Sequence, residues 1–320
     1  MFNFTNNKFL INSQTIAYLE NIVKSKLFNN GYIFYGPEGV GKKDTAIQFA
    51  KKIFKEYSLS KNIEEKISNN NHPDLLIIKP TSLVKIKKKI SSSTEVSKSN
   101  HSEIIKIEQI RNIKTFLSQK SIESEKKIVL IYEAHLLNEA ASNCLLKTLE
   151  EPKNGILILL TTKLDFLLDT IKSRCQLIRF KSLSNQQIKE FLKDNLETSN
   201  YEINKILNFQ DLINSSNGSP KNVLENIDIW NTISNEIKDK VTSPIKDSIE
   251  ILEVSKLISL ELEPYQQIHL LNLIQKKWWA ETQNINIVKR LETLKNHVKD
   301  NVQPRLAWEV TLLKIANEIL

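Results

Sequence analysis

A glycine-rich loop restricts the fold of this chain more than any other feature of its sequence. The loop GPEGVGK, residues 36–42, directly follows the apolar run Tyr32–Tyr35 and precedes the stretch TAIQFAKKIF. Glycines let backbone N–H groups turn inward around phosphate oxygens, the following helix adds the positive end of its dipole, and a final lysine can contact terminal phosphates. The loop therefore predicts a phosphate-binding α/β domain, unless it is kept only for its strand-to-helix geometry. The candidate binding residues at the loop are Gly36, Gly39, Gly41, Lys42 and Lys43.

Short apolar runs recur through the first 180 or so residues and alternate with helical patterns. This alternation is typical of a parallel α/β sheet. The runs are continuously apolar, which indicates strands covered on both faces, as in a doubly wound sheet. The five predicted strands are Tyr32–Tyr35, Leu75–Lys79, Lys127–Ile131, Ile156–Leu160 and Gln176–Phe180.

Strand patterns almost vanish after Phe180, and helical patterns continue to Leu320. Ser184 with Gln187 three residues later forms a capping-box pattern at the start of a helix. A turn at 217–222 and a boundary near 229–243 divide the helical part. The chain is thus predicted to be α/β plus all-α, with a five-stranded domain over 1–182, a small helical domain over 183–232 and a C-terminal helical domain over 233–320.

Composition supports a globular protein of two or three domains, with 320 residues, 40% hydrophobic and 26% charged. No long apolar span and no secretory start are present, so we expect a cytoplasmic protein that does not enter a membrane. Cys144 and Cys175 are expected to be free, buried thiols. The net charge of +8 favours approach to DNA, unless it reflects only a solvated basic surface. The Lys- and Ser-rich segment 81–103 is expected to be a flexible loop, which either contacts DNA or has no such role.

The residues that would hold magnesium beside the loop are missing. A serine or threonine normally follows the loop lysine and ligates Mg²⁺, but here the position is Lys43. The strand that should end in two acidic residues ends in Tyr132 and Glu133, so only the second acidic residue remains. Two losses at the two metal-contacting positions predict that this chain does not hydrolyse ATP, although its loop keeps the elements for binding nucleotide or phosphate.

Five segments of the first 180 residues form one ordered set: GYIFYGPEGVGKK (31–43), NHPDLLIIKP (71–80), IKIEQIRNIKTFL (105–117), KKIVLIYEAHLLNEAASNCLLKTLEEP (126–152) and IKSRCQLIRF (171–180). In order and spacing, they resemble the corresponding segments of bacterial DNA polymerase III delta-prime subunits. The resemblance extends over nearly the whole chain and implies an AAA+ P-loop domain, a helical lid and a helical collar that joins the subunits of a clamp loader. Tau/gamma subunits share several of the motifs, but the damaged nucleotide site and the short C-terminal region favour delta-prime.

The resemblance implies roles for particular residues. Arg174, in the motif Ser173-Arg174-Cys175, matches an arginine finger that contacts ATP in the adjacent subunit. Taken alone, an arginine at the edge of a strand is more often a surface ion-pair partner, but the ordered motifs around Arg174 favour the finger. Thr162 matches a polar residue that senses the γ-phosphate. Lys221 stands where active relatives have an ATP-contacting arginine, which implies weaker nucleotide sensing. Glu133 is the remnant of the acidic strand end.

The expected partners are the tau/gamma and delta subunits and, through the complex, the sliding clamp and primed DNA. No cofactor is required, ATP with magnesium binds weakly or not at all, and zinc is not expected because residues 55–70 contain no cysteine or histidine. The function implied is that of a subunit that assists ATP-driven clamp loading by supplying Arg174 in trans. The alternatives are an autonomous tau/gamma-type ATPase and an AAA+-derived adaptor outside replication.

Overall fold

The computed structural model describes most of the chain, which forms two compact units. The units are Met1–Ser182 and Leu183–Leu320, and each is described by itself. The described residues are 13–57, 62–69, 71–83, 102–151, 155–196, 213–300 and 302–319.

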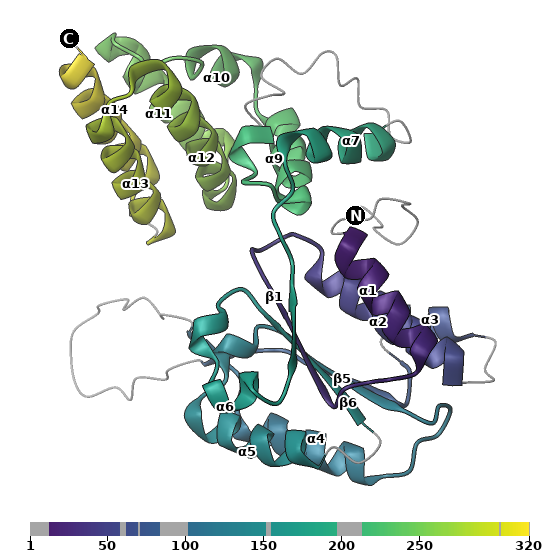
Figure 1. The fold of residues 1–320 in the computed structure, drawn as a ribbon. Helices are drawn as coiled ribbons and strands as arrows, with labels where there is room; N and C mark the ends of the chain where they lie inside the picture. The colour runs from purple at the N-terminus through teal and green to yellow at the C-terminus, as the bar shows by residue number, and fades with distance from the viewer. Residues whose placement is uncertain are drawn as a thin grey trace, which may run out of the picture. The chain divides into compact units, whose positions relative to one another are not determined.

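A five-stranded parallel sheet forms the centre of the first unit (Figure 1). All five predicted strands are confirmed, and their order across the sheet is β2-β5-β6-β1-β7. β2, β5 and β6 follow one another in the sheet, whereas β1 is inserted between β6 and β7; the parallel pairs are joined by crossover connections, which the helices provide. The strands are β1 (Gly31–Tyr35), β2 (Leu75–Ile78), β5 (Lys127–Ile131), β6 (Gly155–Thr161) and β7 (Gln176–Arg179).

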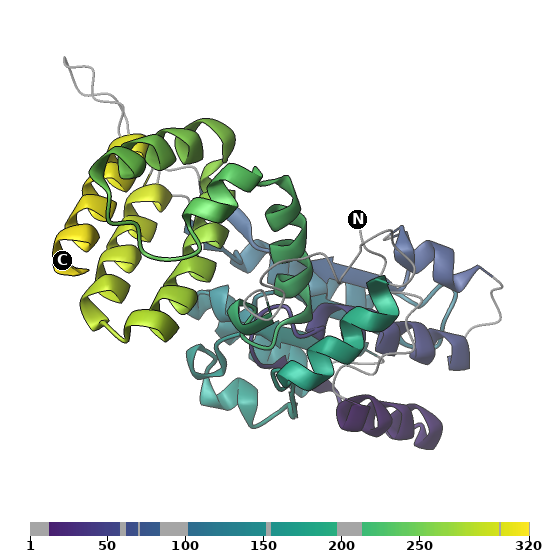
Figure 2. The same cartoon turned by 90° about the horizontal axis from the view of Figure 1, so that it is seen from above.

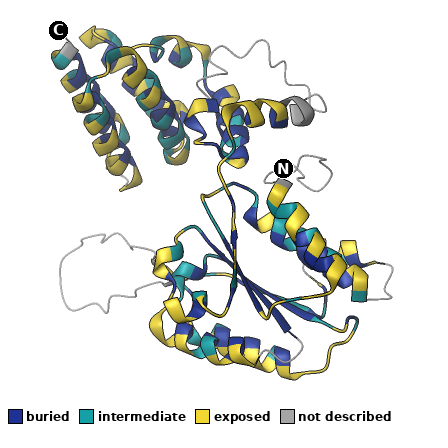
Figure 3. Ribbon diagram, in the orientation of Figure 1, coloured by how far each residue is buried: buried dark blue, intermediate teal, exposed yellow. Residues whose placement is uncertain are grey.

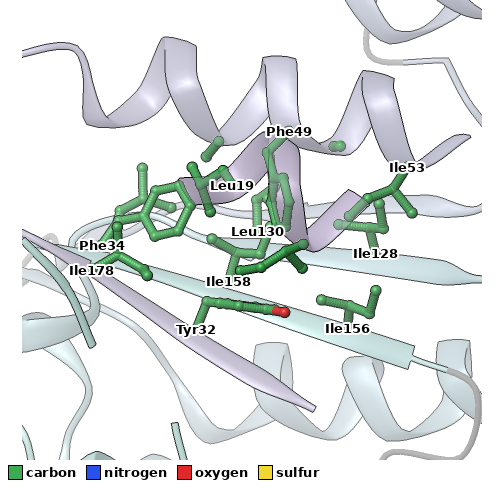
Figure 4. Close-up of a cluster of buried hydrophobic side chains, with 14 of the residues drawn as sticks. Leu19, Tyr32, Phe34, Phe49, Ile53, Ile128, Leu130, Ile156, Ile158 and Ile178 are labelled. Atoms are coloured by element: carbon green, nitrogen blue, oxygen red, sulfur yellow. The ribbon is translucent and has the colours of Figure 1, made fainter. Parts of the chain in front are cut away.

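Helices cover both faces of the sheet, and successive residues of each central strand point to opposite faces. In β5, for example, Ile128 and Leu130 belong to one apolar cluster and Val129 and Ile131 to the other. Figure 4 shows the first cluster, in which Phe49 and Ile53 of α2 lie over the strands. One face packs against α1 (Ser13–Ser25), α2 (Lys42–Tyr57) and α3 (Ile63–Ser68), and the other against α4 (Ile107–Ser118), α5 (Glu139–Glu150) and α6 (Asp169–Lys172).

A second, two-stranded ribbon was not predicted. β3 (Thr81–Leu83) pairs antiparallel with β4 (Ser102–Ile104), so the ends of the segment predicted as a loop over 81–103 are strands. The pattern is hidden in the sequence because each strand has three residues and the intervening chain is long. Residues 84–101 lie outside the described residues, and the DNA-contact hypothesis for this segment stays a prediction.

The described part of the second unit is helical, as the sequence predicts. Ser184 caps α7 (Asn185–Leu196) in the predicted box, because its Oγ accepts from Gln187 N at 3.2 Å and its N–H donates to Gln187 Oε1 at 2.9 Å. Helices α11 to α14 pack beside one another (Figures 1 and 2). The boundary expected near 232–233 stays a prediction. The helices are α9 (Pro220–Thr232), α10 (Asn235–Lys240), α11 (Ser248–Glu261), α12 (Pro264–Thr282), α13 (Ile285–Lys299) and α14 (Pro304–Ile319).

Two tryptophans fix the centre of this helical unit. Trp278 Nε1 donates to Val241 O at 3.2 Å, and Trp308 Nε1 donates to Gln267 Oε1 at 2.9 Å, so both buried indoles are hydrogen-bonded. Trp279, by contrast, is 44% exposed because the helix turns its side chain away from the core. Buried and exposed residues alternate along these helices (Figure 3). Within the described ranges, no helix is both long enough and apolar enough to cross a membrane.

Candidate nucleotide site and exposed arginine

The loop after β1 has the backbone conformation that a phosphate-binding loop requires. Gly36, Gly39 and Gly41 have φ values of 147°, 71° and 86°, which L-residues rarely adopt. A Cβ atom on Gly36 would lie 2.2 Å from the carbonyl oxygen of Phe180, so only glycine fits where β1 ends against the residue following β7. These conformations allow backbone N–H groups of the loop to turn inward around an anion.

Lys42 stabilises the loop from inside. Its Nζ donates to Gly36 O at 2.8 Å and also to Pro37 O, and the residue is only 8% exposed. Burial lowers the pKa of Lys42, while the nearby carboxylates of Glu133 and Glu38 oppose that shift. The structure thus places Lys42 at the loop, as predicted. A bound anion at the loop would stabilise the charged form of Lys42, which burial disfavours.

Lys43 and Tyr132, the two residues that replace the metal-contacting positions, lie against each other. Lys43 Nζ is 5.1 Å from the centroid of the Tyr132 ring, within cation–π distance. Burial raises the pKa of Tyr132 to about 12, and Asp44 adds to the shift, so the phenol is neutral. Its hydroxyl is buried without a hydrogen-bond partner in the described structure. Sequence spacing does not indicate that these residues meet.

Magnesium does not fit this arrangement. The ion prefers several hard oxygen ligands in octahedral geometry. An ammonium has no lone pair to offer, and a neutral phenol packed in an apolar cluster is a poor ligand. Among the described residues, no group of three or more His, Cys, Asp or Glu side chains could hold a metal.

Glu133 follows Tyr132 in the left-handed conformation, with φ of 48°. Its carboxylate lies 3.5 Å from His135 Nδ1, which also lies 3.3 Å from Thr161 Oγ1. Burial lowers the pKa of His135. Thr161, at the end of β6, is fully buried, whereas the candidate sensor Thr162 is only partly buried. Thr161 therefore links the ends of β5 and β6, and a sensing role for Thr162 stays a prediction.

Arg174 follows α6 and lies on the surface of the first unit. Its guanidinium donates through Nη1 to Thr170 O at 3.1 Å and through Nη2 to Glu150 Oε1 at 2.8 Å. The side chain is 39% exposed, and that of Glu150 is 51% exposed. The sequence alone allows either an ion pair or an arginine finger. The structure shows the ion pair, with Glu150 as a partner that sequence spacing did not indicate.

Both cysteines of the first unit, Cys144 and Cys175, are free thiols. Cys175 is buried as expected, and burial raises its pKa to about 12. Its Sγ would lie 2.6 Å from a Cβ on Gly31, so it packs directly over the start of β1. Cys144 was also expected to be buried, but it is only partly covered.

Lys221 belongs to the second unit, at the start of α9. Its Nζ lies 3.4 Å from Glu225 Oε1, one turn along the same helix, and its side chain is 52% exposed. This is a solvated surface ion pair of small energetic weight. A nucleotide-sensing role for Lys221 stays a prediction.

Asp74 is a buried charged residue that no sequence pattern singles out. Its carboxylate accepts hydrogen bonds from the backbone N–H groups of Ile122, Glu123 and Ser124 at 2.7 to 3.2 Å. His72 stacks on Phe54 with ring centroids 4.1 Å apart. These contacts join β2 to the loop before β5 and have a structural role.

Two family models match the chain, one after the other. Residues 11–184 match the family described as "DNA polymerase III, delta subunit", which is more than half of the chain. The chain belongs to this DNA polymerase III subunit family. Residues 186–315 match "Cyanobacterial DNA polymerase III delta prime, C-terminal domain".

Individual relatives agree with this assignment. The DNA polymerase III subunit delta' of Bacillus subtilis is 32% identical over 180 residues, 54% of this chain and 49% of that protein. The tau subunit of the same organism is 31% identical over 180 residues, 53% of this chain and 28% of its own length. The matches therefore span about half or less of these curated relatives.

A solved structure shows the same fold over nearly the whole chain. A DNA polymerase III gamma subunit-related protein of Thermotoga maritima aligns with a TM-score of 0.54, covering 94% of this chain and 98% of that one. The two sequences are 17% identical, so this likeness concerns the fold alone. It agrees with the α/β sheet followed by a helical part that the sequence predicts.

Proposed function

We propose that this protein is a delta-prime-type subunit of a clamp loader, and that it presents Arg174 to ATP bound in a neighbouring subunit. The observation behind the proposal is the contrast between two places in the first unit. The chain's own nucleotide loop faces Lys43 and Tyr132 in place of magnesium ligands, while Arg174 remains partly exposed on the surface.

The chemistry of Arg174 suits a role in trans. A guanidinium is always charged, and its planar donors match phosphate oxygens in pairs. Its present partners, Glu150 and Thr170 O, use donors on Nη1 and Nη2 that a phosphate would accept equally well. An exposed ion pair of this kind costs about 1 kcal/mol or less to break, so a neighbour's ATP can replace Glu150.

The same contrast supports a chain that does not hydrolyse ATP. Phosphoryl transfer depends on a metal that neutralises charge and on an acidic residue that holds it. Both contributing positions are occupied here by residues without suitable ligand atoms. The partners proposed are tau/gamma and delta subunits in a hetero-oligomer, which acts on a sliding clamp and primed DNA.

Sequence identity alone does not distinguish delta-prime from tau/gamma, since B. subtilis relatives of both kinds are 32% and 31% identical to this chain. The match of residues 186–315 to a delta-prime C-terminal domain supports the former. The replaced metal-contacting residues point the same way. An autonomous ATPase is therefore the second candidate, favoured only by the similarity to tau and gamma subunits.

The test is DNA- and clamp-stimulated ATP hydrolysis by the loader reconstituted with tau/gamma and delta subunits from the same cell. Arg174→Ala is expected to lower the rate roughly a thousandfold, the lower end of what an arginine finger contributes. Glu133→Gln is expected to leave the rate within about twofold, because this chain's own strand end takes no part in hydrolysis. Arg111→Ala, on the exposed face of α4, is the matched control for loss of an arginine.

Other results would favour the alternatives. A large loss with Glu133→Gln, or magnesium-dependent turnover by the isolated chain, would identify an autonomous ATPase. Failure of the chain to assemble with tau/gamma and delta subunits would favour an adaptor outside replication.

A further inference from the structure

We propose that the loop Gly36–Lys43 binds the polyphosphate chain of a nucleotide without a divalent cation, and that the Lys43 ammonium takes over the charge-neutralising role of magnesium. This goes beyond the role of Arg174 and concerns a different part of the first unit. Three observations carry it: a loop built for anions, a cation fixed beside it, and a metal position filled by a neutral ring.

The loop has a defined conformation that is stabilised by hydrogen bonds from Lys42. Three glycines hold positive φ values, one of them without room for a Cβ atom, and Lys42 bonds two loop carbonyls from a buried position. Glycine adopts such conformations without strain, so these positions let backbone N–H groups of the loop turn toward an anion. The N-terminus of α2, a helix of 16 residues, adds its dipole at the same place.

Lys43 supplies the fixed positive charge. The residue is exposed, and its Nζ rests 5.1 Å from the ring centroid of Tyr132. The aromatic face attracts the ammonium toward the end of β5, and the three donors of the ammonium remain available to an anion. Lys42 and Lys43 together provide two ammonium groups next to the loop, which offset two negative charges of a polyphosphate.

Tyr132 makes the replacement complete. Its ring is 8% exposed, and its hydroxyl has no hydrogen-bond partner in the described structure. The side chain fills the end of β5 where a carboxylate would otherwise attract a metal. If position 132 were an aspartate, its carboxylate would form an ion pair with the Lys43 ammonium and offset its charge. Facing a neutral ring, Lys43 keeps its full charge for a ligand.

Magnesium is then a competitor at this loop rather than a helper. Magnesium bound to ATP cancels part of the charge that Lys43 would contact, and its hydration shell approaches the ammonium. We therefore expect free ATP to bind at least as tightly in EDTA as in excess magnesium. For ordinary loops of this type, removing magnesium weakens binding, so the sign of the effect separates the two cases.

The test is calorimetric titration of the full chain with ATP, once in EDTA and once in excess magnesium. Lys43→Ala is expected to weaken binding in EDTA about tenfold or more, the loss typical of a charge-assisted hydrogen bond. Lys55→Ala is the matched control, because it removes a lysine from the same helix about 18 Å away at 1.5 Å per residue. Inorganic tripolyphosphate is titrated in parallel: equal affinity assigns recognition to the phosphates alone, and weaker affinity adds a contribution from the nucleoside.

A second variant keeps the result decisive. The double substitution Lys43→Thr with Tyr132→Asp restores the residue types of a metal site, and it should make ATP binding tighter with magnesium than without. Circular dichroism spectra identical to those of the wild type establish that each variant is folded. No binding of ATP to the wild type at millimolar concentration, magnesium-dependent binding, or full affinity in Lys43→Ala would each overturn the proposal. None of these results bears on Arg174, whose test uses the assembled loader.

Discussion

Lys43 and Tyr132, 89 positions apart in the sequence, are in direct contact, with the lysine ammonium 5.1 Å from the centre of the tyrosine ring. Each residue alone removes a magnesium ligand. Together they form a cation–π pair at the junction of α2 and β5, so the two replacements are physically coupled. A lysine beside a carboxylate, or a buried tyrosine beside a metal-binding threonine, would lack this contact.

The Tyr132 hydroxyl is expected to contribute nothing to stability. Because it is buried without a partner, Tyr132→Phe should leave the free energy of unfolding unchanged or raise it by up to about 1 kcal/mol. Tyr132→Ala should lower it by about 3–5 kcal/mol, since a large buried ring is lost. The measurement is hydrogen exchange of the β5 peptide in increasing urea. Tryptophan fluorescence is unsuitable, because all four tryptophans, Trp230, Trp278, Trp279 and Trp308, lie in the second unit.

A marked loss of stability in Tyr132→Phe would contradict this prediction. It would mean that the hydroxyl has a hydrogen-bond partner in solution, such as a water molecule.

Asp74 is expected to be among the most sensitive charged residues of the first unit. Asp74→Asn keeps the shape but replaces acceptor oxygens facing Ile122, Glu123 and Ser124, and it should lower the free energy of unfolding by about 2–3 kcal/mol. The readout is hydrogen exchange of the β2 peptide in urea. The matched control is Asp169→Asn, because its ion pair with Lys172 is exposed and screened by solvent, so its loss should have little effect. Equal effects of the two substitutions would refute the structural role of Asp74.

His72 should make the first unit less stable in mild acid. Burial is the main cause that lowers the pKa of His72, against the attraction of Glu123 and Asp74, so protonation is easier in the unfolded chain than in the folded one. The unfolded pKa is near 6.5. Stability from this residue is therefore complete above pH 6.5 and is lost as the pH falls towards the lowered folded pKa, by up to about 1.4 kcal/mol at pH 5.5.

The variant His72→Phe keeps an aromatic ring against Phe54 but cannot titrate. It should be less stable at every pH, because Asp74 N loses its acceptor at Nδ1, yet it should lose less on acidification than the wild type. Urea-dependent hydrogen exchange of the β2 peptide at pH 7.5 and 5.5 measures both effects. An unchanged acid response would assign the loss to other histidines, such as His135.

Glu150 forms an ion pair with Arg174, but we expect this ion pair not to be needed for the proposed role of Arg174 in ATP hydrolysis by a neighbouring subunit. In the reconstituted loader, Glu150→Gln should change the stimulated rate of ATP hydrolysis by less than about fivefold, because an exposed ion pair contributes at most about 1 kcal/mol. Added to Arg174→Ala, it should have no further effect, since the partner is already gone. A fall of more than tenfold in Glu150→Gln alone would instead make Glu150 a positioning residue for the arginine.

The sequence by itself determined the local elements and the losses at the nucleotide site. The five strands, the loop conformation implied by its glycines and the cap at Ser184 depend on neighbours within a few residues, and such patterns survive in a single sequence. The residue types at 43 and 132 also sufficed to predict a site without metal ligands.

Only the tertiary structure decided which of these residues touch. The sheet order β2-β5-β6-β1-β7 brings strands far apart in the chain together, and no local pattern encodes that order. For the same reason the contact between Lys43 and Tyr132, the pairing of Arg174 with Glu150 and the binding of residues 122–124 by Asp74 became visible only in the fold. The exposure of individual side chains was also decided by the fold. Trp279 and Cys144 lie in apolar stretches of the sequence, but the direction in which each helix turns leaves them partly at the surface.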